Sequence, residues 1–304
     1  MELEASQLSE FDAQFRCVDM RTENLQDHVN SKFSFETTAA KSVPDLAEAR
    51  KQYEETRKGP LASLSVHTFA NMPLMQFLSL DEQNDLKKTL EAYNKEISST
   101  GTTIEKARFS FIRNAIESPI QASATTFLTR RPVVPDPGNY LSVCAMLSHS
   151  FSRGNVHIQS SNHLDKPLID FKYLSHPLDS LILGYHMRSL HRLAQTSPLS
   201  AFLVPNGKTL PPGESISTQL AAAKVVKDYC WTNYHPCGTC AMLPEKMGGV
   251  VNEELKAYGT SNVRIVDASM LPVIPRGNII TMVYAVAEKA ADIIGAELGI
   301  RRMS

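Results

Sequence analysis

The 304-residue sequence lacks several features that would assign it to a specialised class of protein. It has 31 Lys and Arg residues against 32 Asp and Glu, so no excess of one charge favours nucleic acid or an anionic membrane as a partner. Its first residues are acidic and polar, without the basic start and apolar run of a secretory signal. No apolar run approaches the roughly 20 residues of a membrane span. We therefore expect a cytoplasmic protein with no nucleic-acid or membrane partner.

Cysteine is also scarce, and the number of cysteines bears on whether the chain forms disulfides. An odd count in a chain of this length does not predict a disulfide framework. The sequence has no internal repeat and no low-complexity tract. Its length suits one large domain or two modest ones. The five cysteines are Cys17, Cys144, Cys230, Cys237 and Cys240.

Local patterns predict one strand and three helices before residue 120. Phe33 and Phe35 alternate with polar residues, as in a half-buried strand. Ser42 can cap the first helix, and the second opens at Ser79 or Asp81. The three predicted helices cover residues 42–60, 79–98 and 103–118.

From about residue 138 the pattern changes to strands and helices in alternation. Residues 139–161 predict two strands joined by a turn, and residues 263–266 predict a short, mostly buried strand. The last helix, over 279–298, has small and apolar residues on most faces, which predicts packing on more than one side. The other predicted elements are an extended segment at 167–179 and helices at 178–197 and 217–231.

The stretch YHPCGTCAM, residues 234–242, is open to several interpretations. His235, Cys237 and Cys240 could bind zinc, but structural zinc sites usually pair two ligand clusters and only one is present. The Cys-x-x-Cys spacing could be a redox dithiol, but a thioredoxin-like motif lies near the start of a βαβ unit, not late in the chain. His235 could also be a buried histidine held by the backbone, or a catalytic base.

The sequence around and after this stretch resembles the C-terminal signature of the glucose–methanol–choline (GMC) oxidoreductases, flavoenzymes that oxidise alcohols. Four motifs carry the resemblance, and their order and spacing match the family nearly throughout. Asn252 is a small departure, because the family usually has Asp there. The motifs are His-Pro-x-Gly-Thr at 235–239, Gly-Gly-Val-Val at 248–251, Val-Arg-Ile-Val-Asp-Ala-Ser at 263–269 and Tyr-Ala-x-Ala-Glu-Lys at 284–289.

Upstream agreement with the family is weaker but ordered. The segments ENLQDHV at 23–29, SRGNV at 152–156 and PLIDFKYLSHPLD at 167–179 resemble family elements, so the likeness spans roughly residues 20–298. The family's Gly-x-Gly-x-x-Gly turn, which holds the flavin pyrophosphate, does not occur in these 304 residues. The resemblance therefore implies the C-terminal part of a GMC enzyme behind an unrelated start, such as a truncated form or one partner of a split pair.

The implied fold class is α+β. It consists of an antiparallel sheet with helices on one face, the substrate domain, plus a C-terminal strand and helix of an incomplete FAD-binding α/β domain. The expected divisions are an unassigned start at 1–19, a remnant of the FAD domain at 20–40, the substrate domain at 41–225, the C-terminal signature at 226–298 and a tail at 299–304.

The resemblance implies FAD as cofactor, a small-molecule alcohol as substrate, and His235 and Asn278 as the catalytic pair. Histidine suits the proton, because its ordinary pKa of about 6.5 leaves it largely neutral at pH 7. An amide can donate to the alcohol oxygen without competing for its proton. The start of the last helix would place a positive dipole end near the reduced flavin. The implied cofactor contacts are Asp267, Ala268, Asn278, Ile279 and Asn24.

Each of these residues has a plainer interpretation. Asn278 could cap the last helix, Asp267 could cap a strand end, and Asn24 and His28 could be surface residues. The competing function is a catalytically inactive remnant or an interaction subunit that lacks flavin.

Four expectations follow. The side chains of His235 and Asn278 should lie within about 6–7 Å, the span of two hydrogen bonds of about 3 Å, and face an open cleft. Cys237 and Cys240 should be reduced and metal-free. The chain alone should neither hold FAD nor oxidise alcohols. It should expose an apolar face that requires a partner, either a separate flavin-binding half or another copy.

Overall fold

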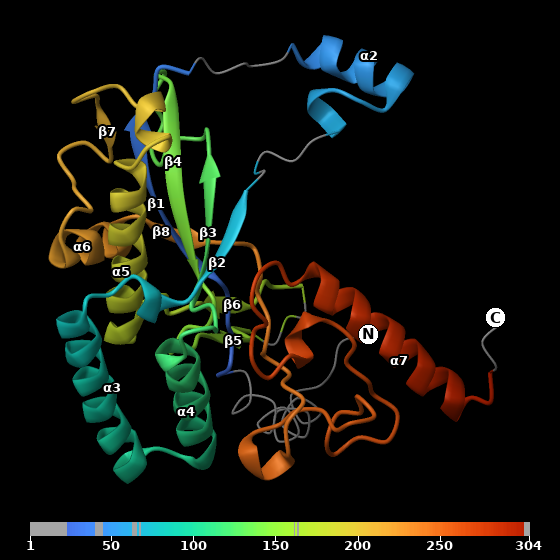
Figure 1. Ribbon diagram of the computed structural model, residues 1–304. Coiled ribbons are helices and arrows are strands. Elements are labelled where there is room, and N and C mark those ends of the chain that lie inside the picture. Colours follow the sequence, from blue (N-terminus) through green and yellow to red (C-terminus); the bar gives the residue numbers. More distant parts are fainter. Residues whose placement is uncertain are drawn as a thin grey trace.

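The protein is built on a six-stranded antiparallel sheet (Figure 1). The computed structural model describes residues 23–39, 45–62, 66, 68–160, 162 and 164–300. The strands run in the order β2-β3-β4-β1-β7, and β8 also pairs with β1. Their bounds are β1 Val29–Glu36, β2 Phe69–Met72, β3 Ala124–Thr129, β4 Tyr140–Leu147, β7 Thr209–Leu210 and β8 Cys230–Thr232.

The two faces of this sheet differ in character, because successive side chains of a strand point to opposite faces. In β1, Val29 and Phe33 belong to the main hydrophobic core. Asn30 and Lys32, which alternate with them, face the other way: Asn30 is opposite Met146 of β4, and Lys32 is opposite its Cys144. The sheet is therefore apolar toward the helices and partly polar on its other face.

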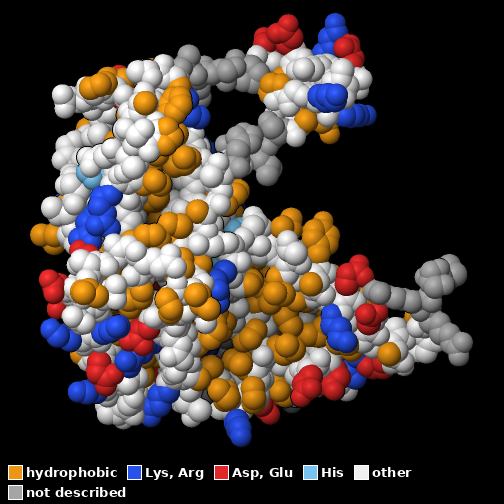
Figure 2. Space-filling model, viewed as in Figure 1, with side chains coloured by type: hydrophobic (Ala, Val, Ile, Leu, Met, Phe, Trp, Pro, Cys, Tyr) orange, Lys and Arg blue, Asp and Glu red, His pale blue; other side chains and the backbone are white. Residues whose placement is uncertain are grey.

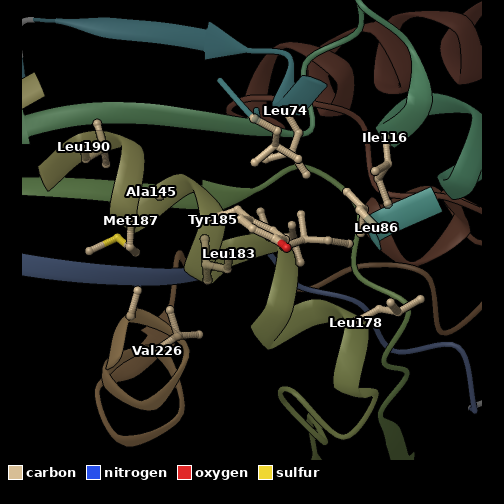
Figure 3. Packing of buried hydrophobic residues seen from close by; sticks show 14 of the residues in the cluster. Leu74, Leu86, Ile116, Ala145, Leu178, Leu183, Tyr185, Met187, Leu190 and Val226 are labelled. Atoms are coloured by element: carbon tan, nitrogen blue, oxygen red, sulfur yellow. The ribbon is translucent and has the colours of Figure 1, made fainter. Parts of the chain in front are cut away.

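Helices α5 (Pro177–Ala194) and α6 (Gln219–Asp228) cover the apolar face, beside the helical pair α3 (Leu80–Thr100) and α4 (Thr103–Glu117). Figure 3 shows Leu183 and Met187 of α5 and Val226 of α6 in the cluster packed against the strands. Full burial of each large apolar side chain contributes roughly 1.5–3 kcal/mol. The predicted α+β class, with helices on one face of an antiparallel sheet, is confirmed.

The helix starts follow from local capping chemistry. The Ser79 hydroxyl accepts a hydrogen bond from the Glu82 N–H, and the Glu82 carboxylate accepts one from the Ser79 N–H, which forms a capping box. This confirms Ser79 as the cap of α3. Helix α2 (Leu46–Thr56) starts later than predicted: Asp45 caps it, whereas Ser42 lies outside the described residues.

Smaller elements complete the described chain. Strands β5 (Asn155–His157) and β6 (Leu168–Asp170) form a separate two-stranded sheet, so the two strands predicted within 139–161 belong to different sheets. None of the helices in the described ranges is long and apolar enough to cross a membrane. The 3₁₀ turns are Pro60–Ala62, Leu74–Gln76, Leu199–Phe202, Glu245–Met247 and Ala268–Met270.

The C-terminal segment departs from two predictions. The buried strand predicted at 263–266 is wrong: Arg264 makes one isolated bridge to Lys256, and Val263 is 48% exposed. A strand needs a neighbour that satisfies its N–H and C=O groups along its length, and in the described chain residues 255–257 supply one bridge and two backbone hydrogen bonds to this segment. Helix α7 (Ile280–Glu297) has Ala290 as its one buried residue, so packing on more than one side is also wrong.

This segment has a hydrophobic core of its own. Its members come from the loops between β8 and α7 and from α7 itself. Figure 2 shows apolar side chains gathered on the surface on this side of the molecule. The buried members are Cys237, Val250, Val251, Leu255, Met270, Leu271, Ile274, Ile279 and Ala290.

The sheet also crosses the domain divisions expected from the sequence. Strand β1 lies in the segment 20–40 and β8 in the segment 226–298, both of which we assigned to the FAD domain. Yet β1 pairs with β4 along its length and with β8 at its start. The two segments thus contribute strands to the sheet of the expected substrate domain, and the division itself stays a prediction.

Candidate active site

His235 lies just after β8, and its backbone is fixed on both sides. The following residue, Pro236, favours an extended backbone at His235. The His235 N–H donates to Oδ1 of Asp27 at 2.9 Å. The other carboxylate oxygen of Asp27 accepts from the hydroxyls of Thr232 and Tyr173. Asp27 therefore ties the histidine segment to the start of β1.

His235 is paired with His28. The two Nδ1 atoms are 2.8 Å apart, and the rings meet edge to face with centroids 5.1 Å apart. Nε2 of His28 lies 3.2 Å from the Ser148 carbonyl oxygen. His28 is fully buried and His235 is 5% exposed.

This contact chain selects the tautomers of both rings. A carbonyl only accepts, so Nε2 of His28 carries the proton and its Nδ1 is an acceptor. Nδ1 of His235 then donates to His28, and Nε2 of His235 is left with a free lone pair. Such a nitrogen can accept a proton from a bound molecule.

The electrostatic surroundings keep both rings neutral. Burial, followed by the nearby His235, lowers the pKa of His28 to about 3. Burial also lowers the pKa of His235, although Asp27 opposes this. At pH 7 the pair therefore holds no positive charge, as a proton acceptor requires.

Asparagine side chains extend the pair toward the polar face of the sheet. As placed, Nδ2 of Asn233 lies 3.2 Å from Nδ1 of His235, and Oδ1 of Asn233 lies 2.5 Å from Nδ2 of Asn30. Two N–H donors cannot share a hydrogen bond, so the tautomer in which Nδ1 of His235 donates requires the Asn233 amide to present its oxygen there. Exchanging O and N in both amides also gives Oδ1 of Asn30, which is buried without a hydrogen-bond partner, a donor from Asn233.

The loop that carries Asn278 lies against the same segment. The carbonyl of Pro275 is near enough to His28 to raise its pKa slightly against the other effects, and Ile274 donates its N–H to Gln26 at 3.1 Å. The separation of about 6–7 Å between the side chains of His235 and Asn278 stays a prediction. Asn278 is exposed and His235 is buried, and the expectation that both face one open cleft stays a prediction.

Asp267 acts as a cap in this structure, whereas Asn278 lies one position before Ile279, the N-cap of α7. Oδ1 of Asn278 accepts from the Ile280 N–H at 3.0 Å, at the start of α7. Oδ1 of Asp267 accepts from the Ser269 N–H at 2.7 Å, at the turn 268–270. Both side chains are exposed. The interpretation as a cap therefore holds for Asp267, which caps a 3₁₀ turn rather than a strand end, but Asn278 bonds to the first N–H of α7 without being its N-cap.

Asn24 is a buried link rather than a surface residue. Its Nδ2 donates to the carbonyls of Gly238 and Pro272 at 2.9 and 3.3 Å, and its Oδ1 accepts from Arg153 at 3.1 Å. Gly238 has φ of +92°, and a Cβ there would lie 2.6 Å from the Asn24 carbonyl oxygen. Glycine is thus needed at the turn behind His235. Of the other implied cofactor contacts, Ile279 is buried and Ala268 half-buried in the C-terminal core.

Cys237 and Cys240 carry free thiols. Burial raises the pKa of Cys237 to about 12, so this thiol stays protonated and is a poor nucleophile. The backbone of Cys237 exchanges hydrogen bonds with Gln26 in both directions. Both cysteines belong to the C-terminal core, which accounts for them as packing residues. That the site is metal-free stays a prediction.

Solved structures of flavoenzymes share this fold. A fungal aryl-alcohol oxidase is 26% identical, with a TM-score of 0.72, and the match covers 92% of this chain and 49% of that one. An FAD-dependent oxidoreductase from Chaetomium thermophilum is 25% identical, with a TM-score of 0.76 and the same coverage. The fold is therefore that of part of an oxidoreductase.

Sequence comparison identifies the family. A GMC oxidoreductase family model matches residues 150–287. A GMC oxidoreductase family protein of Malassezia sympodialis is 39% identical over 154 residues, which cover 51% of this chain and 24% of that protein. A dehydrogenase of Armillaria gallica is 30% identical over 266 residues, which cover 83% of this chain and 39% of that protein. The chain belongs to the GMC oxidoreductase family, of which it carries the C-terminal part, and it spans less than half of each relative.

The sequence interpretation missed the role of His28 and Asp27. They are adjacent in ENLQDHV, a stretch that we related to the family; by resemblance we placed His28 near the cofactor, with a surface position as the alternative, and we assigned nothing to Asp27. The signal was available: two polar residues directly precede a strand that reads as buried, and buried polar groups need partners. Their partners are more than 200 positions away, at His235 and Thr232.

Proposed function

We propose that this protein takes part in FAD-dependent oxidation of an alcohol, with His235 as the proton acceptor. The observation that carries the proposal is the chain from the Ser148 carbonyl through His28 to His235, which leaves Nε2 of His235 unprotonated. Bound FAD would supply the acceptor for the hydride that leaves the alcohol carbon.

His235 would accept the hydroxyl proton at Nε2 while the alcohol becomes a carbonyl compound. Asn278 would donate from Nδ2 to the alcohol oxygen, while its Oδ1 keeps the bond from the Ile280 N–H. Since His28 cannot readily take a second proton at neutral pH, the positive charge would stay on His235. Asp27, which raises the pKa of His235, would stabilise that charge.

The residues present fit one side of a flavin. The start of α7 supplies N–H groups without intrahelical partners, and the exposed Asp267 and the half-buried Ala268 lie on a turn of the same C-terminal core. A pyrophosphate cradle of the Gly-x-Gly-x-x-Gly kind is not part of these 304 residues. We infer that flavin binding needs a dinucleotide-binding half in addition to these residues.

The test supplies a flavin-binding half from another enzyme. The chain would be co-expressed with the flavin-binding half of a related enzyme, and flavin bleaching by primary and secondary alcohols would be followed without oxygen. We expect alcohol-dependent bleaching, with the rate lowered about 10²–10⁴-fold by His235→Ala. His191→Gln, which changes a half-buried histidine on α5, is the matched control and should bleach normally.

The competing function is an interaction subunit that binds no flavin. The exposed apolar residues of α7 favour it, because such a face suits a protein partner as well as a cofactor domain. A reconstituted complex that holds flavin but bleaches equally fast with His235→Ala would contradict the proposed role of His235. A stable complex that holds no flavin would favour the interaction subunit.

A further inference from the structure

We propose that a cavity between α4 and the turn 152–154 binds a small organic carboxylate. Its volume is about 510 Å³, within the usual range for small-molecule sites. Asn24 lines it, and this residue also bonds to the turn behind His235. The cavity is thus a neighbour of the candidate active site but is lined by other side chains. The residues that carry the argument are Arg108, Arg153, His176, Phe109 and Phe151.

Two guanidinium groups meet at this cavity without a carboxylate bound to either. Arg108 makes no hydrogen bond or ion pair with any residue of the described chain, and its Nε is fully buried. Arg153 donates only to neutral acceptors: Oδ1 of Asn24 at 3.1 Å and the carbonyls of Ser150 and Ser152 at 2.6 and 2.8 Å. Burial and the charge of Arg108 lower the pKa of Arg153 to about 10, although the nearby Asp179, which does not line the cavity, opposes this. An anion between the two would relieve this repulsion.

The carboxylates of the cavity wall are occupied elsewhere. Oε2 of Glu105 accepts from the N–H and hydroxyl of Thr102 at 2.7 and 2.8 Å, as the cap of α4. Glu23 faces His157 at 3.1 Å and Lys172 at 3.8 Å. Neither carboxylate forms an ion pair with the two arginines, so a ligand anion would not meet a competitor already in place.

The rest of the cavity wall is largely apolar, which favours an organic acid over an inorganic anion. Phe109 and Phe151 pack together with ring centroids 5.2 Å apart, and three isoleucines complete an apolar side. Nδ1 of His176 accepts from the Leu178 N–H at 3.2 Å, so the neutral ring carries its proton on Nε2 and can donate. The cavity thus combines cationic donors with an apolar wall, which matches a carboxylate on a hydrocarbon or aromatic body.

The experiment is calorimetric titration of the 304-residue chain with 4-phenylbutyrate and with its neutral amide. We expect the acid to bind at least tenfold more tightly than the amide, because the amide offers no charge to the arginines. Arg108→Gln should weaken the acid at least tenfold and leave the amide unchanged. Lys106→Gln, which removes a positive charge from an exposed site on the same helix, should change neither.

Three outcomes of this experiment would contradict the proposal. Equal affinity for acid and amide, no heat from the acid, or an Arg108→Gln variant that still binds the acid normally would each overturn the proposal. Circular dichroism establishes that the variants are folded. If Arg108→Gln does not fold, Ile104→Trp, which fills the apolar side of the cavity, must abolish binding of the acid.

Discussion

At the scale of single residues, Asp27 holds the candidate active site together. Its carboxylate accepts from a backbone N–H and two hydroxyls, on β8, its following turn and residue 173. Asp27→Ala would leave these buried donors without an acceptor. We expect a loss of about 3 kcal/mol in the free energy of unfolding, measured by urea denaturation. Glu253→Ala, at an exposed position, should change it by less than about 0.5 kcal/mol.

His186 makes the stability of the fold depend on pH. It is buried in α5 beside the Ser123 hydroxyl, at 2.9 Å, and burial lowers its pKa to about 3. The unfolded chain, with an ordinary histidine pKa of about 6.5, binds this proton more readily than the native protein does. The stabilisation is therefore complete above pH 6.5 and is lost as pH falls toward 3.

The corresponding variant is His186→Gln, which keeps a donor for Ser123 but cannot titrate. Between pH 6 and 4, its free energy of unfolding should fall less steeply than that of the wild type, by up to about 1.4 kcal/mol per pH unit. His28 and His149 also have lowered pKa values, to about 3 and 4, so the variant keeps part of the slope. Identical slopes would mean that His186 is not held neutral in the native protein.

At the scale of elements, local chemistry explains which predictions succeeded. The helices at 80–100 and 103–117 were predictable because each carries its own cap, in Ser79 and Thr102, and its own apolar period. The segment 263–266 reads as a buried strand, but whether it becomes one depends on a neighbouring strand. Its valines are exposed here, and residues 255–257 form only a short contact with it, so the described chain does not supply a strand that pairs along its length.

The exposed apolar face of helix α7 also has no packing partner in the described chain. Ile280 is 57% and Tyr284 69% exposed, one turn apart on the helix. Replacing both by Lys should change the free energy of unfolding by less than about 1 kcal/mol, since little buried contact is lost, and should reduce light scattering by concentrated protein. Ala290→Lys, at the buried position of this helix, should destabilise the fold instead. Strong destabilisation by the double change would show that the apolar face is already packed.

At the scale of the whole molecule, the candidate site is assembled from segments far apart in the sequence. His28 and His235 are 207 positions apart, and their pairing follows from the position of β1 between β4 and β8. No local pattern encodes such a contact. The resemblance to the family pointed to both His235 and the segment ENLQDHV. The chain of hydrogen bonds that sets the histidine tautomers could be found only from the structure.

At the scale of the whole molecule, the chain also carries only part of a flavin-binding site. The chain spans 49% of the aryl-alcohol oxidase whose fold it shares. Its contribution to a flavin site is the start of α7, the turn 268–270 and the histidine pair, with no Gly-x-Gly-x-x-Gly turn for the pyrophosphate. In dinucleotide sites the pyrophosphate is bound at such a turn and at the start of the helix that follows it. The 304 residues alone should therefore not retain FAD.

The measurement is the flavin absorbance of the purified, desalted chain after expression with excess riboflavin supply. We expect no flavin in the chain alone and about one flavin per complex when a flavin-binding half from a related enzyme is co-expressed. The α7 variant with Lys at 280 and 284 is the control for the interface: it should fold, yet lose the complex and its flavin together, because the apolar face would be the contact. Stoichiometric flavin in the isolated chain, bleached by an alcohol, would mean that these residues form a complete cofactor site by themselves.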